Sequence, residues 1–189
     1  IRTLQTEPQL LTGLETLRKD WQTGRLIHGD VRLANLLVKT QQAEGESSSP
    51  AQVTLIDFEH CGFGDCRWDV GSVFGGLLCS WVLSAPIDGR QDPGNFLDIA
   101  KFPLSGVQAA SRLFWRGYRR NRFSDSPRLV DCVQFAGVRI IHTAFERAAE
   151  TQEIDNHNAA LLQLGANLIV SPSDAALELL GIDEMEPTK

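Results

Sequence analysis

The chain has 189 residues, of which 42% are hydrophobic and 22% charged, and its formal net charge is −6 at pH 7. This composition is typical of a soluble globular protein with one ordinary domain, and the acidic balance argues against broad binding to nucleic acid or membrane surfaces. No apolar run reaches the roughly 18 residues of a membrane-spanning helix, and the first residues lack the pattern of an export signal. We therefore expect a cytoplasmic protein without a nucleic-acid or membrane partner.

The first predicted element is an amphipathic helix over residues 8–24, because apolar residues recur there at helical spacing and Gly24 is a suitable stop. Two short strands are predicted over residues 35–39 and 53–56, which are rich in apolar and β-branched residues. Residues 41–52 between them are rich in Ser and Glu, which predicts a flexible surface loop.

Helices follow the second strand, each predicted from apolar residues at helical spacing. The first has Asp69 at its expected N-cap and ends before Pro86. After a loop rich in Pro, Gly and Asp, further helices are predicted over residues 104–120, 126–150, 156–169 and 172–180. The predicted fold class is α+β: a small β-hairpin followed by a mostly helical remainder, in one lobe over residues 1–182 with a tail over 183–189.

The use of cysteine and methionine adds two expectations. The spacings of the four cysteines fit no zinc site, so we expect reduced and mostly buried thiols at Cys61, Cys66, Cys79 and Cys132. The single methionine is Met185, and the first residue is Ile1. We therefore expect the chain to be part of a longer protein whose front end precedes Ile1.

The residues with the clearest chemistry follow the first helix. His28, Gly29 and Asp30 are followed, after four residues, by Asn35. In a kinase-type site the Asp of such a loop accepts the proton of the acceptor hydroxyl, and the Asn binds a metal ion. The second strand leads directly into Asp57, where the other metal ligand of such a site is expected. The joint spacing predicts a phosphotransferase site whose amide and carboxylate oxygens hold Mg²⁺.

These motifs resemble the aminoglycoside phosphotransferase family, the kinase-like group that also includes choline, homoserine and fructosamine kinases. The resemblance rests on LIHGDVRLANLLV at residues 26–38, on LIDFE at 55–59 and on G-D-x3-D-V-G at 64–71. It implies a protein-kinase-like C-terminal lobe in which Asp30 is the catalytic base. It also implies that Asn35 and Asp57 bind Mg²⁺ and, through it, the phosphates of ATP.

The resemblance implies supporting roles for three further residues. His28 would brace the catalytic loop, and Asp69 would hydrogen-bond back to that loop and hold its shape. Arg32 occupies a place where the family often has His or Lys near the transferring phosphate, although a surface salt bridge explains it equally well. Cys66 is a departure, because family members often have Pro at that place, and it affects the stiffness of the turn more than the chemistry.

The function that these patterns favour is transfer of the γ-phosphate of ATP to a hydroxyl of a small molecule. A kinase acting on Ser or Thr of a peptide and a non-catalytic, pseudokinase-like binding module remain as alternatives. The residues before Leu26 contain neither a Gly-rich phosphate loop nor a strand lysine. We therefore expect the N-terminal nucleotide lobe to lie upstream of residue 1, and negligible turnover by the isolated chain.

The remaining polar residues are expected to be structural. Three histidines have no motif around them and are interpreted as isolated surface or hydrogen-bonded residues: His60, His142 and His157. A cluster of arginines is interpreted as a solvated helix end rather than an anion site: Arg116, Arg119, Arg120 and Arg122.

Overall fold

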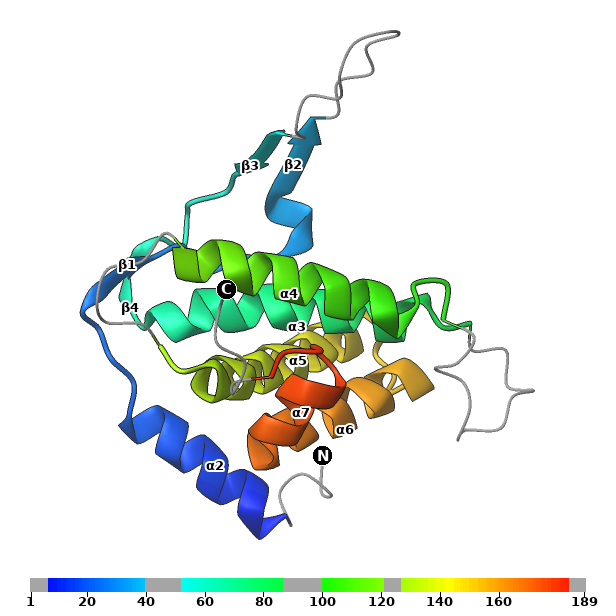
Figure 1. Cartoon of the computed structure of the whole chain (residues 1–189). Coiled ribbons are helices and arrows are strands. Elements are labelled where there is room, and N and C mark those ends of the chain that lie inside the picture. The colour runs from blue at the N-terminus through cyan, green and yellow to red at the C-terminus, as the bar shows by residue number, and fades with distance from the viewer. Residues whose placement is uncertain (1–6, 40–51, 87–99, 121–126, 184–189) are drawn as a thin grey trace, which may run out of the picture.

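The computed structural model describes residues 7–39, 52–86, 100–120 and 127–183. Helices make up most of this part of the chain, and four short strands form two small antiparallel sheets (Figure 1). The coarse α+β prediction is therefore confirmed. The helices are α2 (Pro8–Lys19), α3 (Cys66–Ser84), α4 (Leu104–Arg120), α5 (Leu129–Thr151), α6 (Asn156–Val170) and α7 (Pro172–Glu178).

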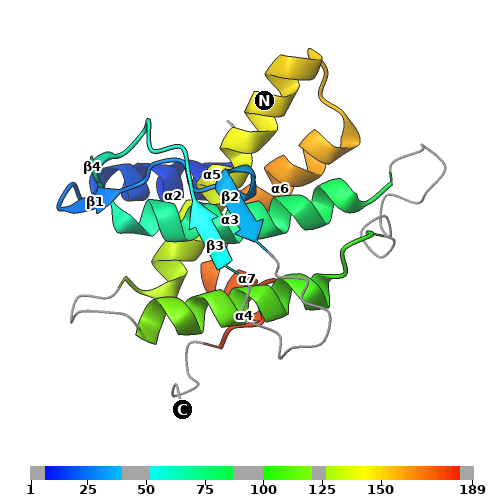
Figure 2. The same ribbon diagram turned by 90° about the horizontal axis from the view of Figure 1, so that it is seen from above.

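The two sheets bring the predicted motif segments together. Strand β2 (Leu36–Lys39) pairs with β3 (Gln52–Leu55), which confirms the predicted hairpin. Asn35 lies just outside it, in a 3₁₀ turn η1 (Leu33–Asn35). The hairpin stands out from the helical body and lies above α3 when the molecule is viewed from above (Figures 1 and 2). A second pair, β1 (Arg25–Ile27) with β4 (Gly62–Gly64), was not predicted.

The first helix ends earlier than the sequence predicted. It stops at Lys19, and the backbone N–H of Asp20 donates to the Thr16 carbonyl 2.9 Å away. The Trp21 ring, which stays partly exposed, meets those of Trp68 and Phe135 edge to face, at centroid distances of 6.4 and 5.7 Å. The prediction of a helix up to Gly24 was wrong because this tertiary packing outweighs the local periodicity.

Two other helix starts also differ from the prediction. Asp65 caps α3, because its side chain accepts a hydrogen bond from the Arg67 N–H, and Asp69 lies one turn inside the helix. Helix α5 begins at Leu129 with Arg128 as N-cap residue, later than the predicted start. Parts of other predictions lie outside the described residues, among them 41–51 of the loop, 184–189 of the tail and Arg122.

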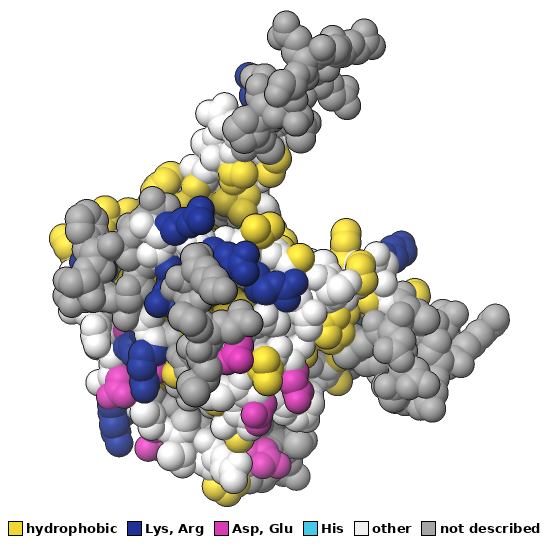
Figure 3. All heavy atoms as spheres, in the orientation of Figure 1, with side chains coloured by type: hydrophobic (Ala, Val, Ile, Leu, Met, Phe, Trp, Pro, Cys, Tyr) yellow, Lys and Arg dark blue, Asp and Glu magenta, His cyan; other side chains and the backbone are white. Residues whose placement is uncertain are grey.

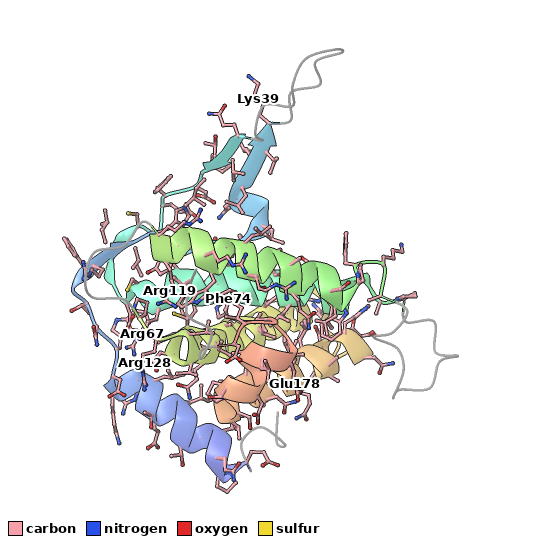
Figure 4. All side chains as sticks on the ribbon, viewed as in Figure 1. Lys39, Arg67, Phe74, Arg119, Arg128 and Glu178 are labelled. Atoms are coloured by element: carbon pink, nitrogen blue, oxygen red, sulfur yellow. The ribbon has the colours of Figure 1, made fainter. Side chains whose placement is uncertain are left out.

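The core lies where α3, α5 and α6 pack together, with α4 and α7 covering it. Its largest buried side chains come mainly from α3, α5 and α6, with one from the segment after α7, and include Phe74 (labelled in Figure 4), Leu78, Leu129, Ile140, Leu161, Leu168 and Leu180. Among the described residues, no helix combines the length and apolarity that a membrane crossing requires. All four cysteines are free thiols, with Cys79 and Cys132 buried and Cys61 exposed.

A charged link near the start of α3 joins this core to the segment after α2. The Arg67 guanidinium pairs with Asp65, donates to the Asp20 carbonyl at 2.6 Å and lies over the Phe135 ring at 5.1 Å (Figure 4). The backbone N–H of Gln22 donates to the second oxygen of Asp65. These contacts fix the chain entering β1, and thus the direction from which the first motif is reached.

The arginines of α4 form a basic surface on the face seen in Figure 3. Arg116, Arg119 and Arg120 are exposed, which agrees with the predicted solvated helix end. They make no ion pair with the residues that the structure describes. Nothing in their geometry adds a ligand site to that interpretation.

Close backbone contact between α5 and α6 leads to a stability prediction. A Cβ atom at Gly137 would lie 2.6 Å from the Gly165 carbonyl oxygen and 2.8 Å from Ile169 Cγ1. We expect Gly137→Ala to lower the free energy of unfolding by about 1–3 kcal/mol or more, because the helices must separate. Denaturant unfolding with an unchanged m value measures this.

The matched control is Gly117→Ala on α4, where a Cβ atom would meet nothing within 4 Å. Alanine is a better helix former than glycine, so the free energy of unfolding should stay constant or rise by up to about 1 kcal/mol. Equal effects of the two substitutions would contradict the packing that the structure describes.

Candidate active site

The loop between β1 and η1 carries the first motif, and Gly29 sets its path. Gly29 has a φ of 83°, in the left-handed region that glycine adopts readily. A Cβ atom there would lie 2.5 Å from the His60 carbonyl oxygen. Only glycine therefore allows this turn and also the close approach of the segment that follows β3.

His28 connects the loop to that same segment. Its buried ring accepts the Asp30 N–H at Nδ1, 3.3 Å away, so the proton is on Nε2, which donates to the Ile56 carbonyl at 2.9 Å. The ring also lies 4.6 Å from that of Phe58. A neutral His28 thus holds the loop of Asp30 against the residues next to Asp57.

The first turn of α3 holds the loop from the other side. The Asp69 carboxylate accepts the backbone N–H of His28 at 2.7 Å and that of Gly29 at 3.0 Å. Trp68 Nε1 donates to the Gly29 carbonyl at 2.8 Å. The hydrogen bonds between Asp69 and the loop that the resemblance implied are therefore present, donated by the loop backbone, although Asp69 is not the N-cap.

Each hydrogen bond that the charged Asp69 accepts contributes about 1.5–3 kcal/mol. We expect Asp69→Ala to lower the free energy of unfolding by this amount for each bond that water does not replace. The loop that carries Asp30 should also lose its shape. Asp174→Ala is the matched control, because Asp174 is an exposed acid in the first turn of α7. Its loss should cost at most about 1 kcal/mol. Equal losses in the two variants, measured by thermal unfolding, would contradict the bracing contact.

Asp30 is 8% exposed, and polar groups surround its carboxylate. Oδ1 accepts Arg32 Nε at 2.9 Å and lies 3.4 Å from Arg139 Nη2, while Oδ2 accepts Asn35 Nδ2 at 3.2 Å. Burial raises the pKa of Asp30, but the hydrogen bond and charge of Arg32, the charge of Arg139 and the Asn35 hydrogen bond together outweigh it. The pKa is therefore lowered from its ordinary value of 3.8. Asp30 is ionised at neutral pH and able to accept a proton.

Arg32 forms a salt bridge with Asp30, which is one of the two roles that the sequence left open for it. Its Nη2 lies 2.8 Å from Asp30 Oδ1 and 3.7 Å from Glu146 Oε1. Its pKa is raised, first by the hydrogen bond to Asp30, against the effect of burial, and then by the charges of Asp30, Glu146 and Asp57. The side chain remains 41% exposed. The guanidinium thus contacts the Asp30 carboxylate and lies within electrostatic reach of Asp57.

Asn35 and Asp57 provide the oxygen atoms that a metal ion would need. Asn35 is buried, and its Nδ2 donates to the carbonyl and carboxylate of Asp30, which leaves Oδ1 outside these bonds. Its backbone carbonyl accepts the Ile56 N–H at 3.0 Å, which brings the end of β3 to η1. Asp57 follows with a φ of 67°, exposed and without a hydrogen bond or ion pair to the described residues.

This donor set fits Mg²⁺, which prefers hard oxygen ligands and commonly takes only one or two carboxylates alongside phosphate and water. In the described part of the chain, no three His, Cys, Asp or Glu side chains gather to hold a metal ion. Asn35 and Asp57 would therefore form a site that phosphate oxygens complete, rather than a cage made by protein alone.

Sequence reasoning missed the contribution of α5. Arg139 Nη1 lies 3.2 Å from His142 Nδ1, and Arg139 Nη2 lies 3.8 Å from Glu146 Oε2. His142 is also 3.5 Å from Glu146 and its side chain is 55% exposed, which agrees with the prediction of a surface or hydrogen-bonded residue. The available signal was an arginine between the buried Ala136 and Ile140, where an apolar helix face would otherwise carry an aliphatic residue. His157, by contrast, donates to the Ala85 carbonyl at 2.8 Å, as a structural histidine does.

The loop, the hairpin and the start of α3 lie in a part of the chain that matches a known family. A model of the phosphotransferase enzyme family, APH, matches residues 2–98. The chain belongs to this family. Searches of curated proteins and of solved structures found no match. The segment matched to the APH family contains every site residue that the sequence predicted, whereas Arg139, His142 and Glu146 lie beyond it.

Proposed function

We propose that this APH-family protein is an ATP-dependent phosphotransferase that moves the γ-phosphate to a hydroxyl of a small molecule. The residues described above would then form the protein-kinase-like C-terminal lobe of the enzyme. The observation that carries the proposal is the buried, ionised Asp30, held in its loop by His28 and Asp69 and bonded to Asn35. A soluble, cytoplasmic enzyme with no nucleic-acid or membrane partner is part of the same proposal.

In this mechanism Asp30 receives the proton of the acceptor hydroxyl. The acceptor oxygen forms a bond to the γ-phosphorus as the bond from that phosphorus to the bridging oxygen of ADP breaks, so ADP leaves. A positioned base of this kind typically contributes about 10²–10⁴ in rate. His28 and Asp69 act by fixing the loop, since their hydrogen bonds reach its backbone rather than the substrate.

Asn35 and Asp57 would hold Mg²⁺, through the Asn35 amide oxygen and the Asp57 carboxylate. When bound, the ion supplies positive charge to the phosphates of ATP. The bond from Ile56 N–H to the Asn35 carbonyl keeps the two ligands on neighbouring backbone. Arg32 would contact the transferred phosphate, because its exposed guanidinium lies beside Asp30 and within reach of the charge of Asp57. The salt bridge to Asp30 is present, and the phosphate role requires the guanidinium to turn from it.

The test is transfer of label from γ-labelled ATP by the full protein in the presence of Mg²⁺. Pools of amino sugars, amino alcohols and peptides are compared as acceptors. Label on a small molecule that disappears with Asp30→Ala supports the proposal. Label on peptide alone would replace the small-molecule acceptor with Ser or Thr. Transfer to none of the pools, with Mg²⁺·ATP still bound, would indicate a non-catalytic binding module.

A further inference from the structure

Arg139 is the charged residue near Asp30 that the proposed mechanism has not used. It lies on α5, only 7% exposed, within a helix whose neighbouring residues Ala136 and Ile140 are fully buried. A buried guanidinium is costly unless it is paired. Its partners are the carboxylates of Asp30 and Glu146, with His142 at its other nitrogen.

The backbone of two helices determines where this guanidinium lies. A Cβ atom at Gly75 of α3 would be 3.2 Å from the Ala136 carbonyl oxygen and 3.4 Å from both Cβ and Cγ of Arg139. The missing side chain at Gly75 therefore lets α5 approach and leaves room for the stem of Arg139. The cation is held by packed helices and does not depend on a surface loop for its position.

Arg139 and Arg32 contact the same carboxylate oxygen from different surroundings. Arg32 makes the shorter contacts to Asp30 Oδ1, at 2.8 and 2.9 Å, but its side chain is 41% exposed and belongs to the loop. Arg139 is farther away, at 3.4 Å, and its side chain is only 9% exposed. If Arg32 turns to the phosphate, as proposed above, Asp30 loses its nearest cation and keeps Arg139.

We propose that Arg139 is the positioning residue of Asp30, which keeps the carboxylate in place and oriented while Arg32 contacts the transferred phosphate. This inference rests on the proposed phosphotransferase function. It gives the two arginines separate effects: Arg139 acts on the chemical step through Asp30, whereas Arg32 acts on the nucleotide. A displacement of about 1 Å in a reacting group can cost on the order of 10² in rate, so the effect is measurable.

The experiment measures kcat and KM for ATP in the full protein for Arg139→Ala, Arg139→Lys and wild type. We expect Arg139→Ala to lower kcat by about 10²-fold with KM for ATP changed less than about threefold, and Arg139→Lys to lose less than about tenfold. Millimolar guanidinium, far below denaturing concentrations, should raise the kcat of Arg139→Ala and leave wild type unchanged. A purely structural role would not produce this rescue.

Arg147→Ala is the matched control, because Arg147 lies two turns further along α5 and pairs with Asp155 at 3.6 Å instead. It should keep the wild-type kcat. If Arg139→Ala does not fold, Arg139→Gln takes its place in the same comparison. A kcat within twofold of wild type, or a loss that guanidinium and lysine both fail to restore, would overturn the inference alone. Absence of transfer by wild type would contradict the proposed function as well.

Discussion

Replacing Asp30 with asparagine is expected to lower kcat for phosphate transfer by about 10²–10⁴, the contribution of a positioned base. Asparagine has nearly the same shape, so the hydrogen bonds of the loop to His28 and Asp69 should persist, because they involve backbone atoms. The amide cannot accept the acceptor proton, however, and the charge that faces Arg32 is gone. Steady-state transfer from labelled ATP measures the loss.

The same variant should change how stability depends on pH. The pKa of Asp30 in the folded protein is lowered below 3.8, so its ionised form stabilises the fold at neutral pH. That contribution is lost only as pH falls through the lowered pKa, and Asp30→Asn should therefore remove part of the stability loss seen in strong acid. Asp20→Asn, at an exposed position, is the control for both measurements. A variant Asp30→Asn with more than a tenth of the wild-type kcat would contradict the role of base.

The sequence predicted the parts of the site that are local in the chain. The motif from His28 to Asn35 leads directly into the first strand of the β2–β3 hairpin, and Asp57 follows its second strand, so spacing along the chain determines which residues meet. The hydrogen bonds that Asp69 accepts from the loop were also predictable, because the G-D-x3-D segment carries a resemblance to known phosphotransferases. These predictions required no knowledge of how the helices pack.

Residues that reach the site from distant elements could not be predicted in this way. Periodicity identifies the buried face of α5, but it does not say that this face meets the loop of Asp30. The approach of Arg139 depends on glycines of α3, whose importance appears only when the two helices are packed. Trp21 shows the same limit, since its contacts with Trp68 and Phe135 end a periodic pattern that continues in the sequence.

Replacing Asp57 with asparagine is expected to lower kcat by about 10²-fold or more and to raise the Mg²⁺ concentration required for half-maximal rate. Metal ions contribute several kcal/mol to phosphate chemistry, and each loss of about 1.4 kcal/mol is a factor of ten. Asparagine is the suitable replacement because residue 57 has a φ of 67°, a conformation that Asp and Asn tolerate better than most other residues. A loss of rate in Asp57→Asn would therefore be caused by the loss of the carboxylate rather than by backbone strain.

A second variant, Asp57→Gly, separates the two effects further, because glycine adopts the left-handed region freely but brings no oxygen ligand. At ordinary Mg²⁺ both variants should lose activity to a similar extent. Added Mg²⁺ should restore the activity of Asp57→Asn better than that of Asp57→Gly, since an amide oxygen still binds a hard cation. Glu59→Gln is the matched control: Glu59 is exposed two residues away, next to His60 at 3.5 Å. Its Mg²⁺ dependence should match wild type. Full activity in Asp57→Gly at ordinary Mg²⁺ would remove Asp57 from the metal site and leave Asn35 as its one proposed ligand.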